Sequence, residues 1–191
     1  MPKQKITKEM VVTAAFELAR TQGINEVMVK NIAEKLGCSV QPIYSYCQNM
    51  ENLRHDVIKR AKCFIQDYVA EHIDTNNLFQ STGQAYVQIA KEEPNLFKMF
   101  ILHSREGISS LEDLYQAETD PQMAKVIANE LNISISQAKM LHLNMLIYTI
   151  GIGTIFSVTT PGISAEEIFT QQEIAYQAFL KQALEAKREI N

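Results

Sequence analysis

The chain has 191 residues, of which 46% are hydrophobic and 21% are charged. This composition suits one sizeable domain, or a small domain joined to a larger one, and it excludes an intrinsically disordered chain. Seven glycines and five prolines are too few for a loop-rich all-β or low-complexity protein. The net charge is −4, but residues 1–60 hold nine Lys and Arg against six acids. Either this asymmetry arose by chance, or the basic first third and the acidic remainder have different roles.

The cysteines and the N-terminus are typical of a cytoplasmic protein. Cys38, Cys47 and Cys63 are odd in number and form no CxxC pair, which disfavours a disulfide framework or a zinc site. No apolar segment follows the N-terminal lysines, so we expect no signal peptide. Cys38, beside a predicted turn, is either an oxidation sensor or an inert small residue.

One apolar segment, residues 140–160, is long enough to cross a membrane and carries no formal charge. It contains several hydroxyl and amide side chains, and Pro161-Gly162 follows it without a basic anchor. A helix that is apolar nearly all round is usually a core helix. We therefore expect a buried helix and no membrane partner.

Capping residues and helix breakers divide the chain into about nine predicted helices. They cover residues 8–22, 29–36, 39–46, 50–73, 77–93, 95–102, 122–131, 134–160 and 164–189, with one or two further turns within 106–118. Thr7, Ser39, Asn49, Ser134 and Ser164 stand at N-cap positions, and Gly23 and Gly37 at helix ends. No segment alternates apolar and polar residues for long enough to indicate a strand, so the predicted fold class is all-α.

The most informative segment is residues 30–46, KNIAEKLGCSVQPIYSY. Two short helices meet at a tight turn that contains Gly37. We expect Ile32 on the inner face of the first helix and Ile43 on the inner face of the second, and the small Ala33 allows the two helices to cross closely. This pattern is typical of a helix-turn-helix, whose second helix enters the major groove of double-stranded DNA.

The side chains around this turn suit contact with duplex DNA. Gln41 has an amide that reads adenine or bridges a phosphate, and Lys30 reaches a phosphate or a guanine edge. Tyr44 and Tyr46 offer a hydroxyl to phosphate and a ring to the thymine methyl group or the sugar. The candidate DNA-binding residues are Lys30, Ser39, Val40, Gln41, Pro42, Tyr44, Ser45 and Tyr46, with Lys3 and Lys5 in a short basic arm that continues to Lys8.

Residues 7–53 resemble the DNA-binding domain of the TetR/AcrR-type bacterial transcriptional regulators. The resemblance rests on Ala15, Gly23, the Ile32-Ala33 pair, Gly37, Ser39, Tyr44, Tyr46 and Leu53. It implies a helix-turn-helix domain over residues 1–50 and a helical effector-binding and dimerisation domain over 51–191. Three residues depart from the family pattern: Met28 replaces a capping Thr, Cys47 a core Phe, and Met50 a phosphate-binding Lys.

The resemblance also implies a homodimer, in which the last two helices of each subunit form a four-helix bundle. Ile147, Gly151, Ile155, Phe169 and Phe179 are the candidate interface residues, and Gly151-x-Gly153 would allow close backbone approach. The alternative is that both helices only close the core of the monomer.

A cavity is expected between the long connecting helix and the middle helices. Its candidate lining residues, each of which also suits plain core, are Phe64, Tyr68, Tyr86, Phe97, Phe100, His103, Met145 and Tyr148.

The predicted function is a homodimeric repressor, released from a palindromic operator by a small, mainly apolar ligand. One alternative is a DNA-binding protein without an effector, and another is an all-α enzyme or carrier of apolar molecules. No catalytic triad, paired carboxylates or phosphate loop indicates an enzyme. His103 and His142 lack partners at metal-ligand spacing, so no metal or cofactor is expected.

Overall fold

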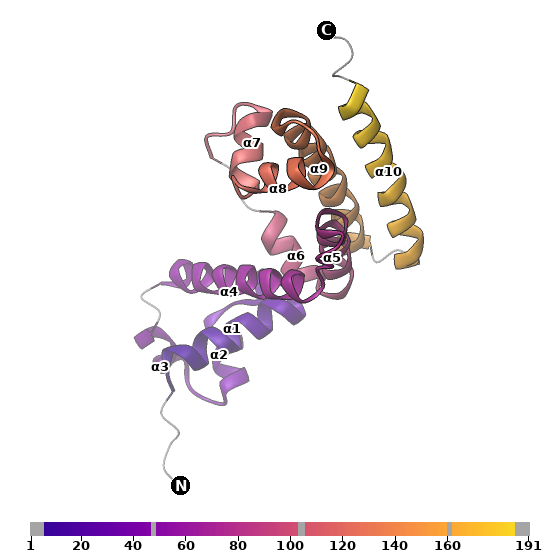
Figure 1. Ribbon diagram of the computed structural model, residues 1–191. Helices are drawn as coiled ribbons and strands as arrows, with labels where there is room; N and C mark the ends of the chain where they lie inside the picture. Colours follow the sequence, from indigo (N-terminus) through magenta and orange to yellow (C-terminus); the bar gives the residue numbers. More distant parts are fainter. Residues whose placement is uncertain (1–5, 47–48, 103–105, 160–161, 186–191) are drawn as a thin grey trace.

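The computed structural model describes residues 6–46, 49–102, 106–159 and 162–185. These residues form ten α-helices, one short 3₁₀-helix and no strand, which confirms the predicted all-α class (Figure 1). The helices are α1 (Lys8–Gln22), α2 (Val29–Leu36), α3 (Val40–Tyr46), α4 (Met50–Glu71), α5 (Leu78–Glu92), α6 (Pro94–Ile101), α7 (Leu111–Glu118), α8 (Met123–Leu131), α9 (Ile135–Thr159) and α10 (Ala165–Glu185), with the 3₁₀-helix at Ile24–Glu26.

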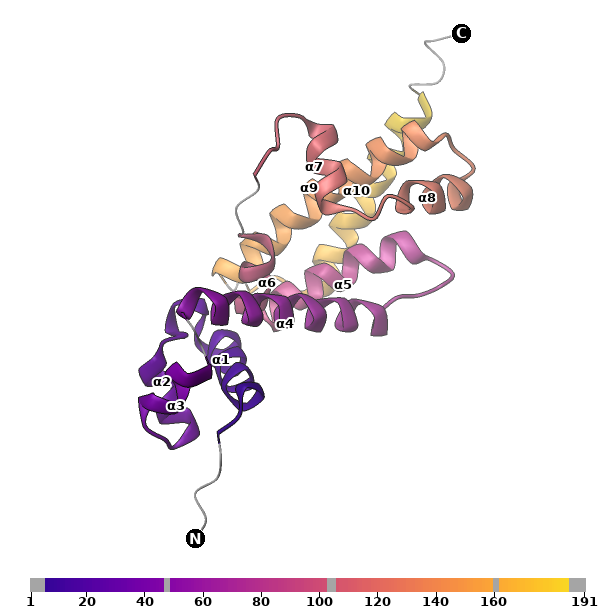
Figure 2. The ribbon, with the colours of Figure 1, turned by 90° about the vertical axis from the view of Figure 1, so that its left-hand side faces the viewer.

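Helices α1, α2 and α3 pack together at one end of the molecule (Figures 1 and 2). The Thr7 hydroxyl oxygen accepts a hydrogen bond from the Met10 N–H at 3.2 Å and so caps α1. Helix α2 ends at Gly37, which has a left-handed backbone with φ of 62°. Glycine adopts this conformation without the steric cost that a side chain would bring. The sharp turn brings Ile32 and Ile43 into the core that also contains α1.

Helix α4 connects this three-helix unit to the rest of the chain, and Figure 2 shows it crossing the middle of the molecule. Its N-cap is Asn49, whose side-chain oxygen accepts from the Asn52 N–H at 2.7 Å. Buried residues recur every four positions along it, at Leu53, Val57, Ala61, Ile65 and Val69. This stripe packs against α1, α5 and α6, so one continuous core runs from the helix-turn-helix into the larger half.

Within the described residues, α9 is the one helix long and apolar enough to cross a membrane. It packs against α5, α6, α8 and α10. Its buried Gln137 donates a side-chain hydrogen bond to the Ala183 carbonyl oxygen at 2.6 Å. These contacts bury one side of α9, but only a third of its most apolar stretch is buried, and Ile147 and Ile155 are about half exposed. The helix is therefore a core helix on one side and not the fully buried helix that was expected.

One detail of the helices differs from the sequence prediction. Residues 111–118 form a complete helix, because Ser110 caps it by accepting from the Asp113 N–H at 3.1 Å and Tyr115 is buried. The described residues therefore contain ten helices where about nine were predicted. At the start of α5, Asn77 makes no side-chain cap. Ser81 stabilises this end instead, accepting from the Asp74 N–H at 3.0 Å and donating to the Asn77 carbonyl oxygen at 2.8 Å.

Candidate nucleic-acid interface and effector pocket

Helix α3 has one face exposed to solvent. Its exposed side chains are Val40, Gln41, Tyr44 and Ser45, with Tyr44 at 61% exposure. Ile43, on the opposite side of the helix, is fully buried and anchors α3 in the core. A short helix held from behind in this way offers its outer side chains to a groove or to another surface.

The structure describes eight of the ten candidate DNA-binding residues. Lys30, in the first turn of α2, and Ser39, directly before α3, are exposed. Pro42 and Tyr46 are half-buried, and Tyr46 packs against the core. Lys3 and Lys5 lie outside the described residues. Lys8 begins α1, and its ammonium group lies 3.0 Å from the carboxylate of Asp56, which ties α1 to α4.

The three departures from the family pattern have different surroundings. Met28 occupies the N-cap position of α2, is 44% exposed and makes no side-chain cap bond. Met50 is half-buried and packs against the core, so it contributes packing where a lysine would contribute charge. Cys47 lies outside the described residues.

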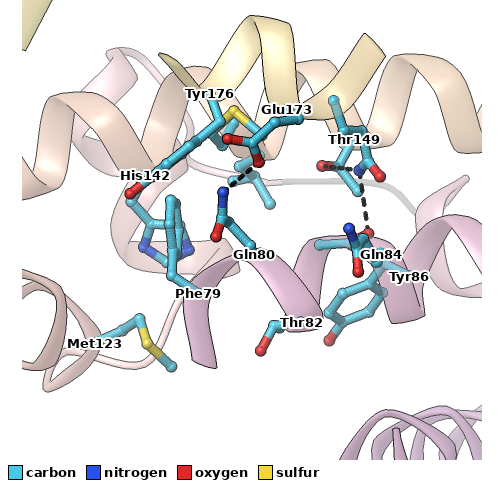
Figure 3. A pocket seen from close by; sticks show the side chains of 14 residues that line it. Phe79, Gln80, Thr82, Gln84, Tyr86, Met123, His142, Thr149, Glu173 and Tyr176 are labelled. Carbon is cyan, nitrogen blue, oxygen red and sulfur yellow. Dashed lines mark hydrogen bonds between the residues drawn. The ribbon is translucent and has the colours of Figure 1, made fainter. Parts of the chain in front are cut away.

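A pocket of about 90 Å³ lies between α5, α9 and α10 (Figure 3). At one end, the rings of Phe79 and His142 meet edge-to-face. At the other end Figure 3 shows Gln84, Tyr86 and Thr149. The full lining consists of Phe79, Gln80, Thr82, Gly83, Gln84, Tyr86, Met123, His142, Met145, Leu146, Thr149, Gln172, Glu173 and Tyr176.

The pocket carries little charge. Burial lowers the pKa of His142 to about 4, so its imidazole is neutral at physiological pH, and its Nδ1 lies 3.0 Å from the Tyr115 hydroxyl. Burial also raises the pKa of the Tyr86 phenol, which stays protonated. The carboxylate of Glu173 accepts hydrogen bonds from the amides of Gln80 and Gln177. Across the described chain, no three His, Cys, Asp or Glu side chains are grouped to hold a metal ion.

Two of the eight candidate ligand residues, Tyr86 and Met145, line this pocket. Phe64 instead packs against Phe16 of α1, with ring centroids 6.1 Å apart. Phe97 is buried against Gly153. These rings fill the layer between α4 and the middle helices, where the cavity was expected, so the pocket lies farther from α4.

The remaining candidates lie elsewhere. Tyr68 donates a hydrogen bond to Glu92 at 2.8 Å and stacks on His72. Phe100 stacks on Tyr86, with centroids 5.9 Å apart. Tyr148 is half-buried and does not line the pocket, and His103 lies outside the described residues.

Sequence reasoning missed most of the pocket residues, including Phe79, Gln80, Gln172 and Tyr176. One signal in the sequence was available. Gly83 stands in the middle of a predicted helix, where glycine is unfavourable without a packing reason. It leaves room beside Thr149 and Gln172, whose side chains would lie 3.7 Å from a Cβ atom at that position.

The candidate dimer residues divide into two groups. Ile147, Gly151 and Ile155 are exposed and recur every four residues, which places them on one side of α9. Phe169 and Phe179 of α10 are half-buried and pack within the protomer, Phe169 on the main core and Phe179 on a smaller cluster of α8, α9 and α10.

Helix α6 connects the pocket to the three-helix unit. Its Phe100 stacks on the pocket residue Tyr86. At its N-terminus, the carboxylate of Glu93 accepts from Nε of Arg20 in α1 at 2.9 and 3.0 Å. The Asn95 side chain donates to the Arg20 carbonyl oxygen at 3.0 Å. Contacts within α6, through Phe100 and Glu93, therefore link the pocket residue Tyr86 to Arg20 of α1.

Comparison with known proteins shows a partial likeness to a regulator. No family model matches the chain. The chain is similar to an uncharacterized HTH-type transcriptional regulator of Bacillus subtilis (strain 168), YobS, with 24% identity over 104 residues. The aligned region is 53% of this chain and 54% of the relative, so the chain spans about half the length of the curated relative it matches.

Proposed function

We propose that this protein is a cytoplasmic, DNA-binding transcriptional regulator and not an enzyme. The observation that carries the proposal is the exposed face of α3, with Gln41 and Tyr44 held outward by the buried Ile43. Lys30 adds a positive charge at the start of the supporting helix. The likeness to a protein named as an HTH-type regulator supports a transcription regulator.

We further propose the TetR/AcrR-type organisation, with residues 1–50 binding DNA and residues 51–191 binding an effector and dimerising. An exposed apolar stripe along α9, formed by Ile147, Gly151, Ile155 and Val158, supports a homodimer. Such stripes are costly to leave in water and are usually covered by a partner. A closed two-fold dimer carries two identical α3 helices and therefore reads a palindromic operator.

In this proposal the protein is a repressor that a small, mainly apolar ligand releases from DNA. The ligand occupies the pocket between α5, α9 and α10 and acts on α1 through Tyr86, Phe100 and the Glu93–Arg20 pair. The ligand shifts the protein toward the conformation that cannot bind DNA only if it binds that conformation more tightly than the DNA-binding one. Operator DNA must then weaken ligand binding by the same factor.

Selection of bound duplexes from a random DNA pool tests the proposal. We expect enrichment of sites with inverted symmetry and an affinity that falls steeply with salt, because lysines and arginines contact phosphates. The absence of enriched duplexes would contradict DNA binding, and enriched sites without symmetry would contradict the dimer.

Substitutions on α3 test which helix reads the DNA. Gln41→Ala and Tyr44→Ala should each weaken binding to the selected duplex by about 1–3 kcal/mol, as expected for a lost base or backbone contact. Gln66→Ala, at an exposed position of α4, is the matched control and should leave affinity unchanged. Full affinity in both α3 variants would place recognition on another element.

A further inference from the structure

We infer that α3 reads A·T base pairs in the major groove, with Val40 and Tyr44 packed on thymine methyl groups and Gln41 hydrogen-bonded to adenine. The base pairs that α3 contacts in each half-site are then mainly A·T, and guanine is not what this helix recognises. This readout rests on the proposed DNA binding and adds to it the bases that the exposed face of α3 selects.

The outer face of α3 carries an apolar row and a polar row. Val40 and Tyr44 are four residues apart, so they lie on the same side of the helix, and they are 43% and 61% exposed. Gln41 and Ser45 form the neighbouring row and are also exposed. Ile43 is fully buried and so determines which side of α3 faces outward.

The apolar row holds most of the exposed apolar surface of the three-helix unit. Within residues 6–46, the large apolar side chains that are exposed to solvent are Met28, Val40 and Tyr44, and the last two belong to α3. Exposed apolar side chains that gather on one face are typical of a binding surface. In the major groove, the apolar group that a base presents is the C5-methyl group of thymine. Val40 and Tyr44 therefore suit thymine.

Gln41 is the polar side chain of this face that remains available for a base. The Ser45 hydroxyl donates to the backbone carbonyl oxygen of Gln41 at 3.2 Å, so its proton is already used within the helix. The side-chain amide of Gln41 makes no hydrogen bond within the described residues. Such an amide pairs with N6 and N7 of adenine, the base that stands opposite thymine.

Recognition of G·C pairs uses charged side chains that α3 lacks. Arginine and lysine are the commonest readers of guanine, and aspartate and glutamate accept from N4 of cytosine. None of the seven residues of α3, VQPIYSY, carries a charge. Lys30 is exposed one helix earlier, and its ammonium group suits a phosphate that positions α3 on the duplex. The uncharged face of α3 therefore favours A·T over G·C.

Base analogues in the selected duplex test each contact. Uracil in place of thymine removes only the C5-methyl group, and 7-deazaadenine in place of adenine replaces the N7 acceptor by a C–H group. We expect one or two thymines per half-site at which uracil weakens binding about fourfold, as expected for one buried methyl group. At one adenine, 7-deazaadenine should weaken binding about tenfold. Fluorescence anisotropy of the labelled duplex measures both effects.

Two substitutions tie these contacts to their residues. In Val40→Ala, uracil and thymine should bind equally at one of the sensitive positions, whereas Val126→Ala, at a valine of similar exposure on α8, should keep the difference. Gln41→Arg should change the preferred pair at one position of each half-site from A·T to G·C, because arginine pairs with guanine. Both α3 substitutions change exposed side chains, so the variants should fold as the wild type does.

The outcomes separate this readout from the proposed function. A selected duplex on which uracil and 7-deazaadenine have no effect at any position would overturn the readout and leave DNA binding intact. G·C pairs at the positions that respond to Val40→Ala and Gln41→Arg would do the same. A chain that selects no duplex would contradict the proposed function and the readout together.

Discussion

Two glycines of α9, two residues apart, have opposite surroundings. A Cβ atom added at Gly153 would lie 2.3 Å from Cζ of Phe97, whereas one added at Gly151 would meet nothing within 4 Å. Phe97 is almost fully buried, so its ring has little room to move. Gly153 is therefore required for packing inside the protomer, while Gly151 is exposed on the outer stripe.

We expect Gly153→Ala to destabilise the fold by about 1–3 kcal/mol, the usual cost of overpacking a core. Gly151→Ala removes the entropic cost of a glycine in a helix and should raise the stability of the subunit by roughly 0.5–1 kcal/mol. Urea unfolding at several protein concentrations separates these effects from dimerisation. Similar changes in both variants would contradict the assigned roles.

His142 makes stability depend on pH. Its pKa is about 6.5 when unfolded and about 4 in the folded protein, where burial disfavours the charged ring. Because the folded pKa is depressed, the unfolded chain binds the extra proton. The stability from the neutral ring is present above about pH 6.5 and is lost as pH falls toward 4.

We expect the free energy of unfolding to fall by about 2 kcal/mol between about pH 7 and pH 5 through this residue. His142→Gln should reduce the pH dependence by that amount, and His55→Gln, at an exposed position of α4, should not. Urea unfolding at the two pH values measures the difference. An unchanged slope in His142→Gln would indicate that another group is responsible.

At the scale of elements, α6 contacts both α1 and the pocket residue Tyr86. The Arg20 side chain makes its hydrogen bonds to Glu93 and also lies over the Phe64 ring, with its guanidinium carbon 5.0 Å from the ring centroid. The coupling between ligand and DNA should therefore depend on this contact.

We expect Arg20→Met to retain binding of a ligand that releases the wild-type protein from the selected duplex, but to reduce the coupling between that ligand and the operator by about 0.5–2 kcal/mol. The coupling free energy follows from the ratio of that ligand's dissociation constants with and without the selected duplex. Lys8→Met is the control, because it removes an ion pair between α1 and α4 and leaves the contact with α6 intact. Full coupling in Arg20→Met would exclude this route.

At the scale of the whole molecule, the exposed apolar side chains of α9 and α10 need an explanation. Ile147, Ile155, Val158 and Ile174 are each about half exposed or more. Helices α9 and α10 belong to the larger half of the molecule, apart from α3 (Figure 1). A dimer formed there leaves both recognition helices free for DNA.

Ile155→Arg should weaken dimerisation by about 3 kcal/mol, because it places an unpaired charge in the interface. Analytical ultracentrifugation should show monomers, and binding to the palindromic duplex should weaken in parallel. Ile58→Arg changes a similarly exposed isoleucine on α4 and should leave the dimer intact. A monomeric wild-type protein would contradict the interface outright.

The sequence by itself determined the helices and the helix-turn-helix, because caps and turns depend on residues close together in the chain. The capping box at Ser134 and Gln137 forms both of its hydrogen bonds, at 3.2 and 2.9 Å. Gly37 produces the predicted turn, and Ile32 and Ile43 are buried as the helical period required.

Only the tertiary structure decided where the pocket lies and which faces of the last helices point outward. Helix α9 is apolar on nearly every side, so its sequence period could not distinguish Gly151 from Gly153. Gln172 and Thr149 resemble surface residues in the sequence, yet packing of α5 against α9 and α10 buries both. Such burial depends on contacts between residues far apart in the chain, and local periodicity carries no information about them.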